Sequence, residues 1–295
     1  MNQRFFLVLI LSTIFTVRGF AQITVTSHNE NNDVVFDVES NMYGSYTLVL
    51  EFNELNGYIR PLGNEAIMVL NPGSNKSVYK LRKSGNSTSS YRYSYKYYQG
   101  KYNAKPNMDF PYLLPLKAGE STTTTRLENI EAKLGRTDID ETLGIVFNYN
   151  GIDTVYAIRS GQVVNIENKI RDRNESEEDI IYYDRDSRTI IEVEHKDGTI
   201  ARYICITSGK NLLDLGSRVI AGQPIAVFTQ EDSNQRLGIH IFHLEKSMER
   251  KVIIPKFYTD SGLMHLEFRK KYVAASSKEI IEKELTKKEK RELNN

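Results

Sequence analysis

The chain has 295 residues and a formal net charge of +1, with 40% hydrophobic and 26% charged residues. This length fits two domains, and the balanced charge gives no electrostatic reason to expect nucleic acid or acidic lipid as a partner. Cys205 is the only cysteine, which excludes an intramolecular disulfide. The many tyrosines favour β-strands, because such side chains fit a pleated, half-buried surface.

The N-terminus has the pattern of a secretory signal peptide, which we assign to residues 1–21. Arg4 precedes an apolar run over residues 5–17, and small residues precede Gln22. The run is too short to span a bilayer as a helix, and no later segment is long and apolar enough to do so. We expect a secreted mature chain without a transmembrane segment; the alternative is an anchor formed by an uncleaved signal.

From Ile23 to about Gly100 the sequence predicts short strands separated by polar turns. The expected strands are residues 23–28, 33–40, 45–52, 65–70, 77–83 and 90–98, with a turn at "NPGSNK", residues 71–76. This spacing predicts a β-sandwich domain over residues 22–105. The last strand, "SYRYSYKYY", fits an edge strand with a polar solvated face; the alternative is a tyrosine surface that stacks on sugar rings or bases.

A proline-bearing connection, residues 104–121, should dock through its aromatic side chains. A second β-region then runs from Glu141 to about Ala274, with a charged loop between its strands. Residues 153–166 should form two strands joined by a glycine turn, and the charged loop follows at 166–187. A hairpin is expected at 188–206, with positive φ at Asp197-Gly198 in its turn. Glycine-separated strands at 212–228 and a strand at 236–245 complete the region.

The C-terminal tail, residues 277–295, predicts a charged helix. It contains helix formers, Glu-to-Lys pairs four residues apart and a serine that can cap the N-terminus. Because it lacks a broad apolar face, we expect this helix to be loosely held.

Five stretches of the second region together resemble the lysostaphin/LytM-type zinc endopeptidases, which cleave peptidoglycan cross-bridges. In chain order they are "YLLPLKAGES", "DTVYAIRSGQVV", "IEVEHKDGTIARYICI", "LGSRVIAGQPIA" and "LGIHIFHLE". The resemblance covers roughly residues 111–274. It implies a mainly β chain in which an antiparallel β-barrel or sandwich domain occupies residues 106–276, and it implies a bacterial, extracytoplasmic location in the periplasm or cell envelope.

The resemblance also implies where zinc chemistry would lie. Active members bind zinc through a His, an Asp and the second His of an HxH strand, while a Tyr-x-His strand and the first His of HxH assist the zinc-bound water. Here Val146 stands at the Asp position, and no histidine precedes it. Tyr203 is kept, but Cys205 replaces the histidine after it. His240 keeps the first HxH position, and Phe242 replaces the second. The resemblance therefore implies a degenerate member with His240 as a remnant, no catalytic residue and no metal.

Three alternatives would give the chain a metal site or a catalytic pair. A β-bulge at Ile241-Phe242 would bring His240 and His243 onto one face, although strand alternation otherwise separates them. Cys205 and His240 would hold zinc together with Asp138 or Asp140, since thiolate and imidazole suit this metal. The same Cys205 and His240 would otherwise form a nucleophilic pair.

The resemblance implies a non-catalytic envelope protein that binds peptidoglycan or regulates a cell-wall hydrolase. The binding site would be the ancestral groove, lined by His195, Tyr203, Cys205, His240 and Phe242. One alternative is an active zinc metalloendopeptidase with rearranged ligands. Another is a surface adhesion or structural protein that binds through the N-terminal sandwich. The sequence does not indicate the oligomeric state.

Overall fold

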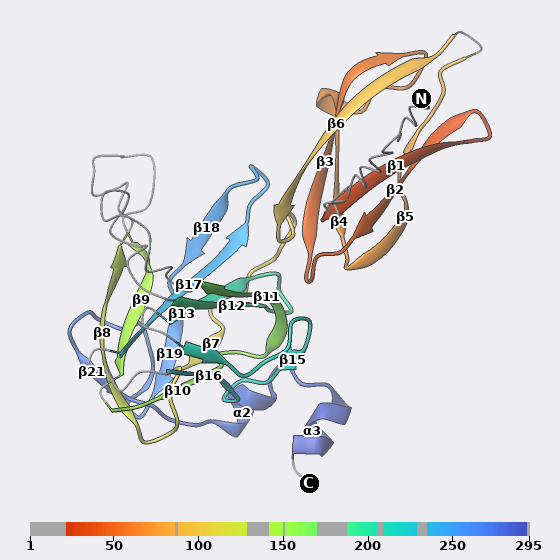
Figure 1. Cartoon of the computed structure of the whole chain (residues 1–295). Helices are drawn as coiled ribbons and strands as arrows, with labels where there is room; N and C mark the ends of the chain where they lie inside the picture. Colours follow the sequence, from red (N-terminus) through yellow and green to blue (C-terminus); the bar gives the residue numbers. More distant parts are fainter. Residues whose placement is uncertain are drawn as a thin grey trace, which may run out of the picture.

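The computed structural model describes residues 22–85, 88–128, 142–149, 151–169, 188–205, 209–228 and 235–293. Within these residues the chain is mainly β, as the sequence predicted, and its strands form five sheets, none of which closes into a barrel (Figure 1). The N-terminal elements are β1 (Ile23–Glu30), β2 (Asp33–Ser40), β3 (Tyr46–Asn56), the 3-10 helix η1 (Leu62–Asn64), β4 (Glu65–Leu70), β5 (Gly73–Leu81) and β6 (Ser90–Gln99).

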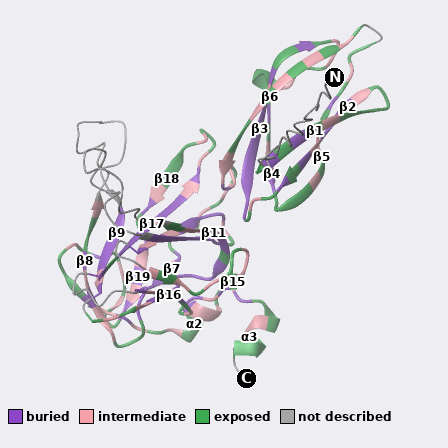
Figure 2. Ribbon diagram, in the orientation of Figure 1, coloured by how far each residue is buried: buried purple, intermediate pink, exposed green. Residues whose placement is uncertain are grey.

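The N-terminal strands form two three-stranded sheets, β1-β2-β5 and β4-β3-β6. Their inner faces enclose an apolar cluster that includes Phe36, Leu48 and Leu50, all with 0% exposure. The alternation of apolar and polar residues along these strands places the apolar ones inside, as expected for a sandwich. Figure 2 shows buried residues along much of β3, a central strand of this sandwich, and exposed residues at the loops between the strands.

The tyrosine-rich strand β6 lies at the edge of its sheet, as predicted. Tyr91, Tyr93 and Tyr95 nevertheless pack against the sandwich core instead of forming an open stacking surface. The Tyr95 hydroxyl donates a hydrogen bond to the Ile23 carbonyl across the sandwich, at 3.2 Å. These three tyrosines are therefore part of the sandwich packing, which leaves Tyr97 and Tyr98 as the tyrosines of β6 available to the adhesion alternative.

The second β-region contains the largest sheet, which has nine strands. Eight of them follow the order β15-β11-β12-β13-β17-β9-β8-β21, and β18 pairs with β17. Their bounds are β8 (Ser121–Glu128), β9 (Thr142–Tyr149), β11 (Gly161–Lys169), β12 (Arg188–Glu194), β13 (Ile200–Cys205), β15 (Arg218–Val219), β17 (Gln235–Leu244), β18 (Arg250–Ile253) and β21 (Lys271–Val273).

Two three-stranded sheets pack with this large sheet around a common apolar core. Their strands are β7 (Pro111–Leu113), β19 (Lys256–Thr259) and β20 (Gly262–Met264) in one sheet, and β10 (Thr154–Tyr156), β14 (Gly209–Asn211) and β16 (Pro224–Phe228) in the other. The pairing of β7 with β19 is parallel. Phe110 and Tyr112 of the proline-bearing connection are 3% and 2% exposed in this core, so the connection docks through its aromatic residues as predicted.

Two predicted local features were wrong. The expected turn at residues 71–76 lies largely inside β5, which begins at Gly73. The expected strand after Leu212 is a loop in which Leu212 and Leu215 are 46% and 41% exposed. The Asn211 side chain accepts a hydrogen bond from the Leu213 backbone N–H at 3.0 Å, and this local bond favours a turn over a strand.

The predicted hairpin of β12 and β13 is confirmed, and it positions the site discussed below. Gly198 has φ +84° in the connecting turn, whereas Asp197 has an ordinary negative φ. Asp197 accepts hydrogen bonds from the Thr199 backbone N–H and hydroxyl instead, at 3.1 and 2.7 Å. The turn therefore needs one glycine and a carboxylate that closes it.

The tail forms two short helices, α2 (Lys278–Glu282) and α3 (Lys287–Leu293). Ser277 caps α2 as predicted, because its hydroxyl accepts from the Ile280 backbone N–H. Ile280 and Leu285 are 8% exposed, so this tail packs against the body instead of being loosely held. No helix in the described part of the chain is long and apolar enough to cross a membrane. The predicted signal peptide and most of the charged loop lie outside the described residues.

Candidate functional site

The two faces of the sheet around β13 and β17 have different surroundings. Tyr203 and Cys205 of β13, with Ile239 and Ile241 of β17, point into the main apolar core. The alternate residues point to the opposite face, where Arg202 lies directly across from His240. We call this opposite face the outer face; the N-terminal sandwich lies over part of it (Figure 1).

The five residues predicted to line one groove therefore do not lie together. Phe242 is two residues from His240 and shares the outer face, and Val146 joins them because it pairs with Gly238 of β17. Tyr203 and Cys205 lie on the core face, so grouping them with His240 was wrong. A sequence comparison fixes position only to within a residue or so, and a shift of one residue moves a side chain to the other face.

Cys205 is enclosed in the core with 1% exposure. Burial raises the pKa of its thiol from the ordinary value to about 12. A neutral thiol is a poor nucleophile and a poor metal ligand. Because Cys205 also points away from His240, neither the predicted nucleophilic pair nor the mixed metal site assembles from these two residues.

His240 and His243 also stay apart. The pairing of β17 with β13 runs from Cys205–Leu237 to Ile200–Phe242 without a shift in register, so the proposed bulge is absent from this strand. Asp138 and Asp140 lie outside the described residues. Among the residues that the structure does describe, no group of three His, Cys, Asp or Glu side chains is placed to hold a metal ion.

His240 lies on the outer face in a partly apolar setting. Its ring centroid is 5.0 Å from that of Phe242, which has 0% exposure. Its Nε2 atom is buried and has no hydrogen-bond partner among the residues that the structure describes. Burial, and then the positive charges of Arg202 and Arg250, lower its pKa to about 4. His240 is therefore a neutral imidazole at pH 7.

Beside His240, a chain of polar side chains joins the two β-regions. Glu192 of β12 accepts from Arg202 Nε at 2.6 Å and from Gln99 Nε2 of the N-terminal region at 2.8 Å. The side-chain amide oxygen Oε1 of Gln99 in turn accepts from Arg250 Nη2 at 3.1 Å. The guanidinium of Arg250 lies 4.8 Å from the centre of the Phe242 ring.

These side chains border a cavity of about 360 Å³ between the N-terminal sandwich and the large sheet. We call it the interdomain cleft; its lining residues are Met42, Tyr46, Tyr97, Gln99, Val164, Asn165, Glu192, Arg202 and Arg250. Burial, and then the negative charge of Glu192, raise the pKa of Tyr46 to about 12, so its hydroxyl stays protonated. The cleft thus combines cations, one carboxylate, amides and phenols with two aliphatic side chains.

Further contacts hold the two regions together next to the cleft. The Ser45 backbone N–H donates to Glu194 Oε2 at 2.7 Å, and Lys101 Nζ lies 3.8 Å from the other oxygen of this carboxylate. A side chain at Gly44 would collide with Val164, since an added Cβ would lie 2.4 Å from it. The sandwich is therefore seated closely on β11 and β12.

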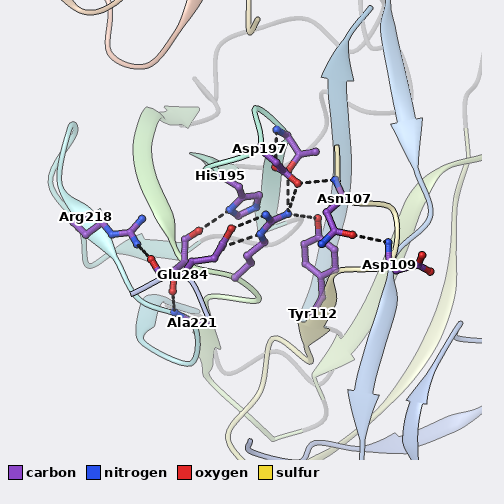
Figure 3. A network of polar contacts seen from close by, with 11 residues as sticks. Asn107, Asp109, Tyr112, His195, Asp197, Arg218, Ala221 and Glu284 are labelled. Atoms are coloured by element: carbon purple, nitrogen blue, oxygen red, sulfur yellow. Dashed lines mark hydrogen bonds and ion pairs between the residues drawn. The ribbon is translucent and has the colours of Figure 1, made fainter. Parts of the chain in front are cut away.

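A second polar network surrounds Arg159, which is only 1% exposed (Figure 3). Its guanidinium binds the Glu284 carboxylate through Nη2 at 2.6 Å and Nε at 3.0 Å. It also donates to Asp197 at 3.0 Å and to the Tyr112 hydroxyl at 3.1 Å. The network thereby ties the connection, the hairpin turn and the C-terminal tail to one buried cation.

His195, which was predicted to line the groove, belongs to this second network. Its Nδ1 atom lies 2.9 Å from the Ser160 carbonyl oxygen, which fixes Nδ1–H as the donor. Its Nε2 atom is buried without a hydrogen-bond partner in the described ranges of the chain, and burial lowers the pKa of the ring to about 3. His195 is separated from the interdomain cleft and packs near Tyr112, with ring centroids 6.2 Å apart.

Glu192, Arg202 and Arg250 were not predicted from the sequence as site residues. The signal was present, because Glu192 and Arg202 interrupt the apolar runs "TIIEVE" and "IARYIC". A charged residue on a central strand needs a partner there, and the hairpin register places these two directly opposite each other.

Comparisons with known proteins find similarity among solved structures. No protein-family model matches the chain, and no curated protein matches it. Among solved structures, the chain is similar to Helicobacter pylori Csd3 in its orthorhombic crystal, with 11% identity and a TM-score of 0.30, covering 92% of this chain and 77% of that chain. The hexagonal crystal gives the same identity and TM-score, covering 92% of this chain and 76% of that chain.

Proposed function

We propose that the chain is a non-catalytic protein of the bacterial cell envelope that binds peptidoglycan through the outer face of the large sheet. The observation that carries this proposal is the composition of that face. Val146 and Phe242 stand where the resemblance to lysostaphin-type endopeptidases implies zinc ligands, and neither side chain has a lone pair to donate. His240 remains, with its Nε2 atom buried and unpartnered.

The same face offers the means to bind a ligand. The interdomain cleft contains two guanidinium groups, phenols and amides, and one of the guanidinium groups belongs to Arg202, which lies directly across from His240. Such a mixture of apolar walls and a few placed polar groups is typical of ligand sites. Binding without hydrolysis is what this chemistry supports, because the face lacks a paired nucleophile and base among the described residues.

The test is co-sedimentation of the purified mature chain with isolated peptidoglycan sacculi. We expect the chain to pellet with sacculi and to release no soluble muropeptides. Failure to pellet would remove the proposal, and so would muropeptide release that depends on stoichiometric zinc and is lost in His240→Ala. The second of these results would establish the metalloendopeptidase alternative instead.

A further inference from the structure

The charges of the interdomain cleft do not cancel. Within the described part of the chain Glu192 is the only carboxylate that lines it, and both of its oxygens are engaged, one by Arg202 and one by Gln99. Among the described residues no carboxylate lies within ion-pair distance of Arg250, which donates a hydrogen bond to the side-chain amide oxygen of Gln99. The cleft therefore carries one positive charge without a counter-charge.

Arg250 is held where a ligand can reach it. Gln99 fixes Nη2, and the face of the Phe242 ring supports the guanidinium at 4.8 Å. Supporting contacts of this kind preorganise a guanidinium, whose planar fork of donors matches a carboxylate. The phenol of Tyr46, which stays protonated, supplies a further donor on the wall of the cleft.

The size and lining of the cleft restrict which ligand can present an anionic group to Arg250. A volume of about 360 Å³ lies at the small end of ligand pockets, which suits a dipeptide better than a glycan chain. Met42 and Val164 give apolar contact for an aliphatic side chain, and the Asn165 amide can bond a peptide group. A dianion such as phosphate would place excess negative charge beside Glu192, so a monoanion fits best.

We propose that the interdomain cleft binds the free carboxylate of a short wall peptide, with Arg250 as its counter-charge. This inference rests on the proposed binding function and names the ligand chemistry of that same face. It also assigns a role to the N-terminal sandwich, since Gln99, Tyr46 and Met42 complete a site that the large sheet alone leaves open.

The test is calorimetric titration of the full mature chain with N-acetyl-D-alanyl-D-alanine and with its C-terminal amide. We expect the acid to bind at least tenfold more tightly than the amide, a difference of about 1.4 kcal/mol. Arg250→Gln should lose at least tenfold in affinity for the acid, and Arg250→Lys should lose less because it keeps the charge. Arg236→Gln is the matched control, since Arg236 is an exposed arginine of β17 outside the cleft.

The outcomes separate this inference from the proposed function. Chain that pellets with sacculi but binds acid and amide equally overturns the carboxylate site and leaves the proposed function standing. Chain that neither pellets nor binds the acid removes both. Tight acid binding that Arg250→Gln leaves unchanged also overturns the site, because another part of the molecule then takes the carboxylate. Thermal unfolding of each variant confirms that it is folded, and the acid-amide comparison needs no variant.

Discussion

Replacing Glu284 with glutamine should release the C-terminal tail from the body of the protein. The Glu284 carboxylate forms two hydrogen bonds to Arg159, and the two side chains are 9% and 2% exposed. Removing one partner of a buried ion pair leaves an uncompensated charge and costs about 3–5 kcal/mol. Asp197 still faces the guanidinium at 3.0 Å, so we expect about 3 kcal/mol, the lower end of that range.

Hydrogen exchange measured by mass spectrometry is the assay, because the loss of stability should affect the C-terminal tail first. Ile280 and Leu285 hold only a small apolar contact, so the tail opens locally before the large sheet unfolds. A loss of about 3 kcal/mol corresponds to roughly 100-fold faster exchange in peptides covering α2 and α3. Peptides covering β13 and β17 should keep their protection.

Glu292→Gln provides the matched control, since Glu292 pairs with Lys288 on the exposed side of α3, where the side chains are 63% and 86% exposed. Exposed pairs contribute about 0–1 kcal/mol, so this variant should exchange like the unaltered protein. Equal exchange in the two variants would refute the reasoning, because the ion pair would then contribute no more when buried than when exposed.

Three further predictions concern buried groups. Burial lowers the pKa of His195 to about 3 and that of His240 to about 4. As the pH falls below about 6.5, these histidines therefore take up protons in the unfolded chain before they do so in the folded protein. The free energy of unfolding should be full above that pH and should fall by on the order of 2 kcal/mol per histidine at pH 5, as measured by urea unfolding. The His240→Gln variant should lose less free energy of unfolding between pH 7 and pH 5 than the unaltered protein. An equal loss would contradict the assignment of His240 as a buried, neutral histidine. Cys205 should not react with a disulfide reagent until urea unfolds the chain, and rapid reaction of the native protein would place the thiol at the surface. Phe242→Ala should destabilise the protein by about 3–5 kcal/mol, against less than about 0.5 kcal/mol for the half-exposed Leu263→Ala, and equal unfolding midpoints would contradict the buried position of Phe242.

Strand positions were predictable because they depend on local patterns. In β1 and β2, alternating apolar residues flank the Asn31-Asn32 turn, and both asparagines adopt positive φ, which this residue tolerates better than most. The hairpin of β12 and β13 was predictable for the same reason, since one glycine at its turn is visible in the sequence. These features need only a few neighbouring residues to specify them.

The face on which each side chain lies was harder to predict than the strand that carries it. Tyr203 and Cys205 were matched to a motif by counting residues, but their face is fixed by pairing of β13 with β17 along Tyr203–Ile239. That register results from packing of the whole sheet, and a slip of one position exchanges core for surface. Residue spacing alone does not contain this information.

Arg159 shows a second limit, which is distance along the chain. In "YAIRSG" an arginine reads as an ordinary polar residue before a turn. Its partners Asp197 and Glu284 follow 38 and 125 residues later, and no local pattern connects them. The tail reads as weakly amphipathic for the same reason, because its strongest attachment is a single charge and not an apolar face.

The chain of polar side chains in the interdomain cleft either holds the two β-regions together or forms a ligand-binding site. A buried ion pair is weak evidence for stability, since the cost of removing its charges from water offsets most of their attraction. Docking of the two β-regions is served by the Gln99 side chain, which donates a hydrogen bond to Glu192 and accepts one from Arg250. Arg250 contributes to docking through this hydrogen bond, but a neutral donor would make the same bond, and among the described residues no carboxylate lies within ion-pair distance of its charge. Since that charge also lies against the Phe242 ring and borders an open cavity, a bound anion accounts for it better than adhesion does.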